Sequence, residues 1–113
     1  MVDGRSLSSR TLGNNTMAIT RINHFESHPD REVDLKAFLT SIIALVRSAP
    51  GCQSCQLLEA IETPCRFVIL EIWDSVEAHH AAAKLVPPDK LRQVMPLLAA
   101  PPVGSYFSVV TAD

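Results

Sequence analysis

The pattern of hydrophobic and polar positions predicts four β-strands in this chain. In the first, residues alternate between two faces, as the period-two geometry of a strand requires. The third begins as an almost unbroken apolar run, which is typical of a strand buried on both faces. The four predicted strands span residues 17–25 (MAITRINHF), 52–61 (CQSCQLLEAI), 65–73 (CRFVILEIW) and 103–111 (VGSYFSVVT).

The longest predicted helix lies between the first two strands, at residues 30–48. Pro29 suits a first helical turn, where its missing N–H costs nothing, and Asp30 and Glu32 suit the positive end of the helix dipole. Pro50 ends the helix. The apolar residues that recur at helical spacing are Leu35, Phe38, Leu39, Ile42, Leu45 and Val46.

A second helix is predicted at residues 76–85 (VEAHHAAAKL), where the alanines have the best helix propensity. Asp74 or Ser75 can cap this helix, and the prolines at 87–88 stop it. Residues 89–100 (DKLRQVMPLLAA) can form a further short helix that breaks around its internal proline.

The predicted order is therefore β-α-β-β-α-(α)-β, the split β-α-β or ferredoxin-like arrangement of the α+β class. In this arrangement a four-stranded antiparallel sheet carries its helices on one face. The other face is too apolar to be left to water, because the third and last strands are hydrophobic on both sides. We therefore expect a homodimer that pairs two sheets into a dimeric α+β barrel, with a cavity between each sheet and its helices.

The length and charge of the chain limit the number of domains and the classes of partner that we expect. We expect one domain at 17–111, after a flexible leader at 1–16 that is rich in Ser, Gly, Asn and Thr; Met17 is an alternative start. The formal charge of −2, with ten basic residues scattered along the chain, indicates no nucleic-acid or membrane-surface partner. The longest apolar run, 67–70, is too short to span a bilayer and the amino terminus lacks an apolar signal segment, so we expect a cytoplasmic protein.

Cys52 and Cys55 form a C-x-x-C sequence on the second predicted strand. A spacing of three on a strand directs the two thiols to opposite faces, where they can neither close a disulfide readily nor bind one metal ion. The total of three cysteines also differs from a disulfide framework. We therefore interpret these cysteines as buried structural thiols.

The stretch 50–81 resembles the antibiotic biosynthesis monooxygenase family of dimeric α+β barrel domains. The resemblance extends over about residues 18 to 110 and implies the same fold. Members of this family include cofactor-free oxygenases of anthrones and dihydroquinones, haem-degrading enzymes and a quorum-signal isomerase. The positions that match the family pattern are Pro50-Gly51-Cys52, Arg66-Phe67-Val68, Glu71, Trp73, Ser75 and Glu77-Ala78.

The resemblance implies a cavity that binds a small organic molecule. In the cofactor-free oxygenases a deprotonated, electron-rich substrate passes an electron to dioxygen itself, so the protein needs a dry pocket, a base or donor, and an aromatic wall. Our leading hypothesis is a homodimeric, cofactor-independent monooxygenase that oxidises a phenolic, quinol or polyketide-like aromatic with dioxygen. The alternatives are a dimer that binds a small molecule without chemistry, and a haem-degrading oxygenase.

Glu71 and Trp73 share one face of the third predicted strand. The Trp73 N–H can donate to a substrate oxygen while its ring stacks on a flat substrate; the alternative is a core tryptophan at a strand end. Glu71 is either a cavity carboxylate of raised pKa that serves as a base, or the ion-pair partner of Arg21 or Arg66 near a rim. We favour the ion pair, because an unpaired buried carboxylate is costly.

Asn23 and His79 are the other candidates for proton transfer. The haem-degrading members carry an asparagine on the first strand, at a place comparable to Asn23, where turn chemistry is the alternative role. His79 stands where anthrone-oxidising members have a tyrosine, titrates near neutrality and can act as a base. His80 lies about 100° around the helix, so at most one of the pair faces the cavity. Haem-degrading members place their iron-binding histidine where this chain has Ala82 and Ala83.

Four further residues are expected to contact the substrate. Phe67 and Ile69 lie on the face of Trp73, although anthrone-oxidising members have an asparagine at the position of Ile69. Tyr106, on the last strand, presents its hydroxyl either to the cavity or to the dimer seam. Arg92, on the short helix, either meets an anionic substrate or faces solvent. We predict no metal site and no cofactor.

Overall fold

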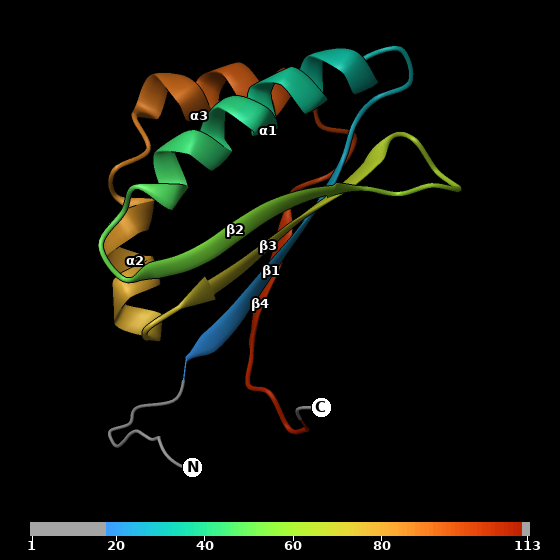
Figure 1. Cartoon of the computed structure of the whole chain (residues 1–113). Helices are drawn as coiled ribbons and strands as arrows, with labels where there is room; N and C mark the ends of the chain where they lie inside the picture. Colours follow the sequence, from blue (N-terminus) through green and yellow to red (C-terminus); the bar gives the residue numbers. More distant parts are fainter. Residues whose placement is uncertain (1–17, 112–113) are drawn as a thin grey trace.

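The structure, a computed structural model, describes residues 18–111 and confirms the predicted order of elements. The fold is α+β and ferredoxin-like, as the sequence pattern predicts (Figure 1). The elements are β1 (Ile19–Glu26), α1 (Glu32–Arg47), β2 (Cys52–Glu59), β3 (Arg66–Trp73), α2 (Val76–Ala83), α3 (Pro88–Val94), a 3₁₀ turn (Met95–Leu97) and β4 (Val103–Phe107).

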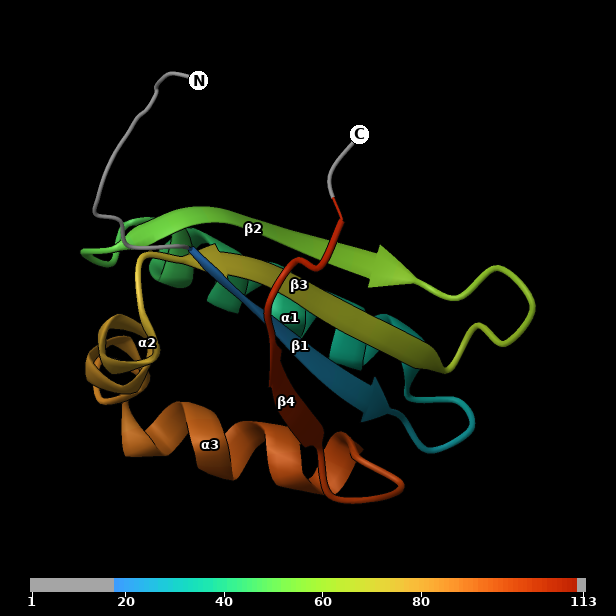
Figure 2. The same ribbon diagram turned by 90° about the horizontal axis from the view of Figure 1, so that it is seen from below.

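The four strands form one antiparallel sheet in the order β2-β3-β1-β4. The helices lie on one side of this sheet (Figure 1). Figure 2 looks onto the opposite face, and no helix of the described residues passes in front of it there. The sheet therefore has a helix-covered face and an uncovered face.

The register of β3 assigns its side chains to these two faces. Phe67, Ile69, Glu71 and Trp73 alternate with less buried neighbours, and all four are buried. On this face Phe67 and Ile69 pack with Leu35 of α1 in the main core cluster. The predicted period-two pattern of this strand is confirmed, and it brings Glu71 and Trp73 under the helices.

The start of helix α1 differs from the prediction. Pro29 and Asp30 lie outside the helix, which begins at Glu32. The N–H of Arg31 donates to the carbonyl of His28 at 3.1 Å, and Asp30 has a φ of 71°. Proline at the second position and a positive φ at the third are the features of a type II turn. The local preference of Pro29 for that turn therefore prevails over its suitability for a first helical turn.

The predicted opposite orientation of Cys52 and Cys55 is wrong. Cys52 pairs with Trp73 and Cys55 with Glu71, because β2 contains a bulge between Cys52 and Ser54. The extra residue of a β-bulge changes which face the following side chains occupy, so both thiols lie on the helix-covered face. The cysteines of the described residues are free thiols. Burial raises the pKa of the Cys55 thiol to about 12, which keeps it protonated and agrees with a structural role.

The uncovered face carries large apolar side chains. Leu58 is 45% exposed, Val103 62% and Phe107 49%. Their cross-strand partners are Val68, His24 and Thr20, which alternate with the residues that face the helices. Within residues 18–111, no helix is long and apolar enough to cross a membrane.

Candidate functional site

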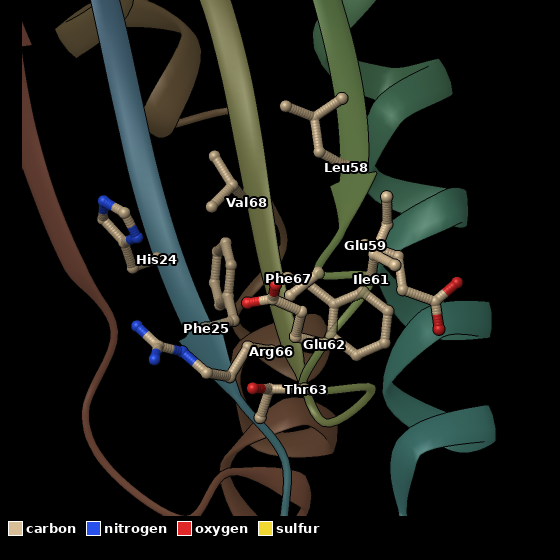
Figure 3. A pocket seen from close by; sticks show the side chains of 11 residues that line it. His24, Phe25, Leu58, Glu59, Ile61, Glu62, Thr63, Arg66, Phe67 and Val68 are labelled. Carbon is tan, nitrogen blue, oxygen red and sulfur yellow. The ribbon is translucent and has the colours of Figure 1, made fainter.

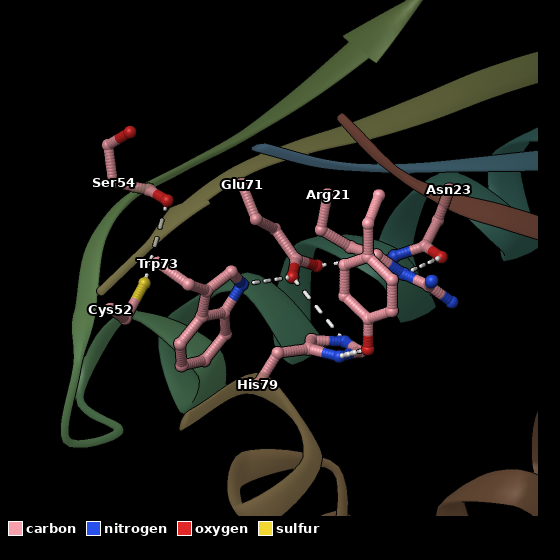
Figure 4. Close-up of polar contacts among 8 residues, drawn as sticks. Arg21, Asn23, Cys52, Ser54, Glu71, Trp73 and His79 are labelled. Atoms are coloured by element: carbon pink, nitrogen blue, oxygen red, sulfur yellow. Dashed lines mark hydrogen bonds and ion pairs between the residues drawn. The ribbon is translucent and has the colours of Figure 1, made fainter. Parts of the chain in front are cut away.

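Six side chains from four elements meet on the helix-covered face, at the end of the sheet beside α2 (Figure 4). The antiparallel register causes this meeting, because Arg21 of β1 lies opposite both Glu71 of β3 and Tyr106 of β4. Helix α2 adds His79, one turn after Ser75 caps the helix by accepting a hydrogen bond from the Ala78 N–H at 3.1 Å. We call this set the polar cluster: Arg21, Asn23, Glu71, Trp73, His79 and Tyr106.

Glu71 is the centre of the polar cluster and is only 4% exposed. The indole N–H of Trp73 donates to its Oε1 at 2.7 Å, and the Asn23 amide donates to its Oε2 at 3.4 Å. Burial raises the pKa of Glu71, while these two hydrogen bonds and the charge of Arg21 act in the opposite direction. Glu71 is thus a buried carboxylate whose two oxygens both accept hydrogen bonds.

The ion pair that we favoured for Glu71 is not the arrangement found. Arg66 lies opposite Glu26, at the far end of β3. Arg21 donates instead from Nε to Asn23 Oδ1 at 3.1 Å, so it reaches Glu71 through the amide. Glu71 is instead a carboxylate on the cavity wall, which is the other alternative that we considered for it.

His79 lies between Glu71 and Tyr106. Its Nδ1 is 2.6 Å from the Tyr106 hydroxyl oxygen, and its Nε2 is 3.9 Å from Glu71 Oε1. Its ring meets the Trp73 ring edge-on, with centroids 5.5 Å apart. Burial, followed by the charges of Arg21 and His80, lowers the pKa of His79, which keeps the ring neutral at neutral pH. His80 is exposed, so one histidine of the pair faces inward, as helical spacing allows.

Arg21 contacts the Tyr106 ring within the polar cluster, and Gly104 of β4 lies against the cluster. The sequence indicated neither of these contacts. The guanidinium carbon of Arg21 lies 4.5 Å from the centre of the Tyr106 ring. A Cβ added to Gly104 would overlap Arg21 Nη2 and Asn23 Oδ1. Glycine therefore permits the close approach of β4 to these two side chains. Their sequence separation leaves no local pattern by which this contact could have been found.

A cavity of about 210 Å³ adjoins the polar cluster, between the sheet and the helices. Asn23, Glu71, Trp73 and His79 supply the polar part of its wall. The rest of the wall is apolar: Phe25, Ile42, Val46, Ile69, Ala82, Ala83, Val86 and Leu91. The structure thus brings four predicted polar residues and Ile69 to one cavity.

Three predicted residues lie elsewhere. Tyr106 contacts His79 on the helix-covered face, so its hydroxyl belongs to the cluster and not to the uncovered face. Phe67 is 1% exposed and lines a different hollow, of about 580 Å³, beside the β2–β3 turn (Figure 3). Arg92 is exposed and forms an ion pair with Asp89 on its own helix. The positions of Phe67 and Arg92 therefore do not support the predicted substrate contacts. Phe67 is buried in the core, and Arg92 is exposed to solvent.

Within residues 18–111, no group of three or more His, Cys, Asp and Glu side chains could hold a metal ion. The polar groups of the cavity wall are the imidazole of His79, the carboxylate of Glu71, the amide of Asn23 and the indole of Trp73.

Comparison with known proteins gives the family. Residues 18–85 match the family described as antibiotic biosynthesis monooxygenase. Comparison with curated proteins finds no match.

Solved structures of similar fold agree with the family match. Rv0793 from Mycobacterium tuberculosis is 25% identical with a TM-score of 0.73, over 84% of this chain and 97% of that one. PA3566 from Pseudomonas aeruginosa is 19% identical with a TM-score of 0.76, over 88% and 100%. A variant of SnoaB from Streptomyces nogalater, a cofactor-independent oxygenase, is 17% identical with a TM-score of 0.70, over 86% and 97%. Since the family match covers more than half of its length, this chain belongs to the antibiotic biosynthesis monooxygenase family.

Proposed function

We propose that the protein is a homodimeric, cofactor-independent monooxygenase of small phenolic or quinol substrates. The observation that carries this proposal is a histidine of lowered pKa, His79, on the wall of a largely apolar cavity beside the buried Glu71. For a 1,4-quinol the reaction is quinol plus dioxygen to hydroxyquinone plus water. One oxygen atom enters the ring, and all four electrons that reduce dioxygen come from the substrate, so no external reductant is needed.

His79 is the proposed base. In the tautomer that donates from Nδ1 to the Tyr106 oxygen, Nε2 keeps its lone pair and can take the proton of the substrate hydroxyl. The resulting phenolate passes one electron to dioxygen, and the semiquinone and superoxide join through a C–O bond. The distal peroxide oxygen takes back the proton held by His79. The O–O bond then breaks as the ring carbon loses its proton, and the departing hydroxide takes up that proton and leaves as water.

In its ionised form, Glu71 would stabilise the imidazolium formed in the first step. Its Oε1 lies 3.9 Å from His79 Nε2, close enough for a substantial interaction between opposite charges in a buried site. Trp73 positions that carboxylate through its N–H, and its indole ring forms part of the cavity wall. In this role Trp73 acts through Glu71, in place of the direct donation to substrate expected from the sequence.

The uncovered face supports the proposed homodimer. Leu58, Val103 and Phe107 leave a broad apolar surface on the side of the sheet away from the cavity. An apolar surface of this kind favours association, and a second copy of the same sheet would bury it. The family resemblance implies the same dimeric α+β barrel.

The test of the proposal is oxygen uptake with quinols under ¹⁸O₂. We expect one ¹⁸O atom in the hydroxyquinone, one ¹⁸O in water and no accumulation of hydrogen peroxide, which would instead indicate simple oxidation of quinol to quinone. His79→Gln should lower kcat/KM by about 100-fold or more, the usual contribution of a general base. His80→Gln, at the exposed neighbouring position, is the matched control and should lower kcat/KM far less than His79→Gln. Saturable binding of quinols without any oxygen uptake would overturn the proposal in favour of a non-catalytic binding protein.

A further inference from the structure

We infer that the cavity selects substrates with a single aromatic ring that bears short alkyl groups. This inference rests on the proposed function and specifies its substrate class. The cavity has a volume of about 210 Å³. A cavity of about 150 Å³ lined by aliphatic and aromatic side chains holds benzene, whereas pockets for larger ligands occupy about 300–1,000 Å³. One ring with small substituents fits between these limits, and three fused rings do not.

The distribution of polarity in the wall explains the preference for alkyl groups. Asn23, Glu71 and His79 lie on the side of the polar cluster. The helices contribute aliphatic side chains, among them Ile42 and Val86. A hydroxyl placed against the aliphatic part would lose its hydrogen bonds to water without replacement. A ring with a hydroxyl directed to His79 and methyl or ethyl groups directed to the helices satisfies both parts of the wall.

The opening of the cavity lies between α2 and α3. Ala83 and Leu91 both line the cavity and are exposed, Leu91 by 55%. Ala82, by contrast, is buried against Trp73 and Ala49. A larger side chain at position 83 should therefore obstruct the opening and leave the core intact. A larger side chain at position 82 would disturb the core.

The test measures binding in the absence of oxygen. Trp73 is the chain's only tryptophan and lines the cavity, so its fluorescence reports occupancy from a single position, independently of turnover. The titrants are trimethylhydroquinone with one ring, 1,4-dihydroxynaphthalene with two and anthrone with three. We expect saturable quenching by the first, and at least tenfold weaker binding of anthrone.

Two variants check that the quenching comes from this cavity. Ala83→Leu should weaken the binding of trimethylhydroquinone at least tenfold, whereas Ala81→Leu, at an exposed position of the same helix that does not line the cavity, should leave it unchanged. Leu91→Ala should enlarge the opening and reduce the difference in affinity between the one-ring and two-ring ligands. The inference would be overturned if anthrone bound as tightly as trimethylhydroquinone. It would also be overturned if Ala83→Leu and Ala81→Leu had equal effects on binding.

The outcomes separate this inference from the proposed function. Size-selective binding with no oxygen uptake would refute the oxygenase and leave the size limit standing. Turnover of anthrone at the rate of the one-ring quinol would support the oxygenase and overturn the size limit.

Discussion

The indole N–H of Trp73 donates to the carboxylate of Glu71, two residues earlier on the same strand, at 2.7 Å. Side chains two apart on a strand point to the same face, so this pair is set by the local geometry of β3. The donation gives the indole an acceptor inside the protein and gives the buried carboxylate a fixed orientation toward His79. The pair therefore connects the cavity wall with the carboxylate that lies beside His79, the proposed base.

Trp73→Phe should destabilise the fold through the unpaired carboxylate. Phenylalanine keeps most of the ring but removes the donor, and a buried acceptor left unsatisfied costs about 1–3 kcal/mol. Urea unfolding of Trp73→Phe, Glu71→Gln and the double variant gives the coupling between the two residues. We expect the double variant to lose less stability than the sum of the single variants. Simple additivity would show that the hydrogen bond contributes nothing to stability.

The lowered pKa of His79 predicts how stability depends on pH. The ordinary value is 6.5, and the folded-state pKa lies below it. The unfolded chain therefore binds the proton more readily, so the free energy of unfolding falls as the pH drops through 6.5 toward the folded-state pKa. Urea unfolding between pH 8 and pH 5 should show the wild type losing stability relative to His79→Gln over this window. A constant difference between the two proteins would contradict the prediction.

The same titration predicts the acid limb of activity. A base must be neutral to accept a proton, so kcat/KM should fall only below the ordinary histidine pKa. The measurement is a pH–rate profile of kcat/KM under conditions where dioxygen saturates the enzyme. An acid limb above pH 6.5 would show that the group responsible is not the buried His79.

Gly104→Ala should damage the polar cluster without a change in any of its six residues. The added Cβ would overlap Arg21 Nη2 and Asn23 Oδ1, and overpacking of this kind costs about 1–3 kcal/mol. We expect a lower melting temperature and a lower kcat/KM, because displacement of Asn23 removes a donor from Glu71. Ser105→Ala, whose side chain lies on the uncovered face, is the control. Unchanged activity in Gly104→Ala would mean that the Arg21–Asn23 contact is dispensable.

Leu58→Asp should weaken the proposed dimer. A carboxylate on the apolar uncovered face would be buried without a partner on association. Sedimentation equilibrium should give a dimer dissociation constant at least tenfold higher than that of the wild type. Val33→Asp, at an 80% exposed position of α1, is the matched control and should leave the constant unchanged. A wild-type protein that is monomeric at micromolar concentrations would contradict the dimer itself.

The elements were predictable because their signals are local. The period of two along β3 assigns Glu71 and Trp73 to one face, and helical spacing in α1 places Leu35 and Leu39 in the core. The cap at Ser75 likewise follows from residue type. These features depend on neighbours within a few residues, which is what a sequence pattern records.

The details of the site depended on contacts between distant residues. The bulge in β2 reverses the expected orientation of Cys52 relative to Cys55, and no residue type near the bulge predicts the extra residue. The contact of Arg21 with Tyr106 requires the register of β1 against β4, which the sequence does not specify. The preference for an ion pair at Glu71 failed for the same reason, because the amide of Asn23 and the indole of Trp73 satisfy the carboxylate instead.

We expect the two neighbouring histidines of α2 to make this site tolerant of a loss of one residue from the turn before the helix. His79 faces inward because the helix starts at a fixed residue, and its neighbour is rotated by about 100°. If the turn lost one residue and the helix kept its place, His80 would move into the position that His79 now holds. An imidazole would then still lie beside Glu71, so the proposed base would be replaced by an equivalent side chain.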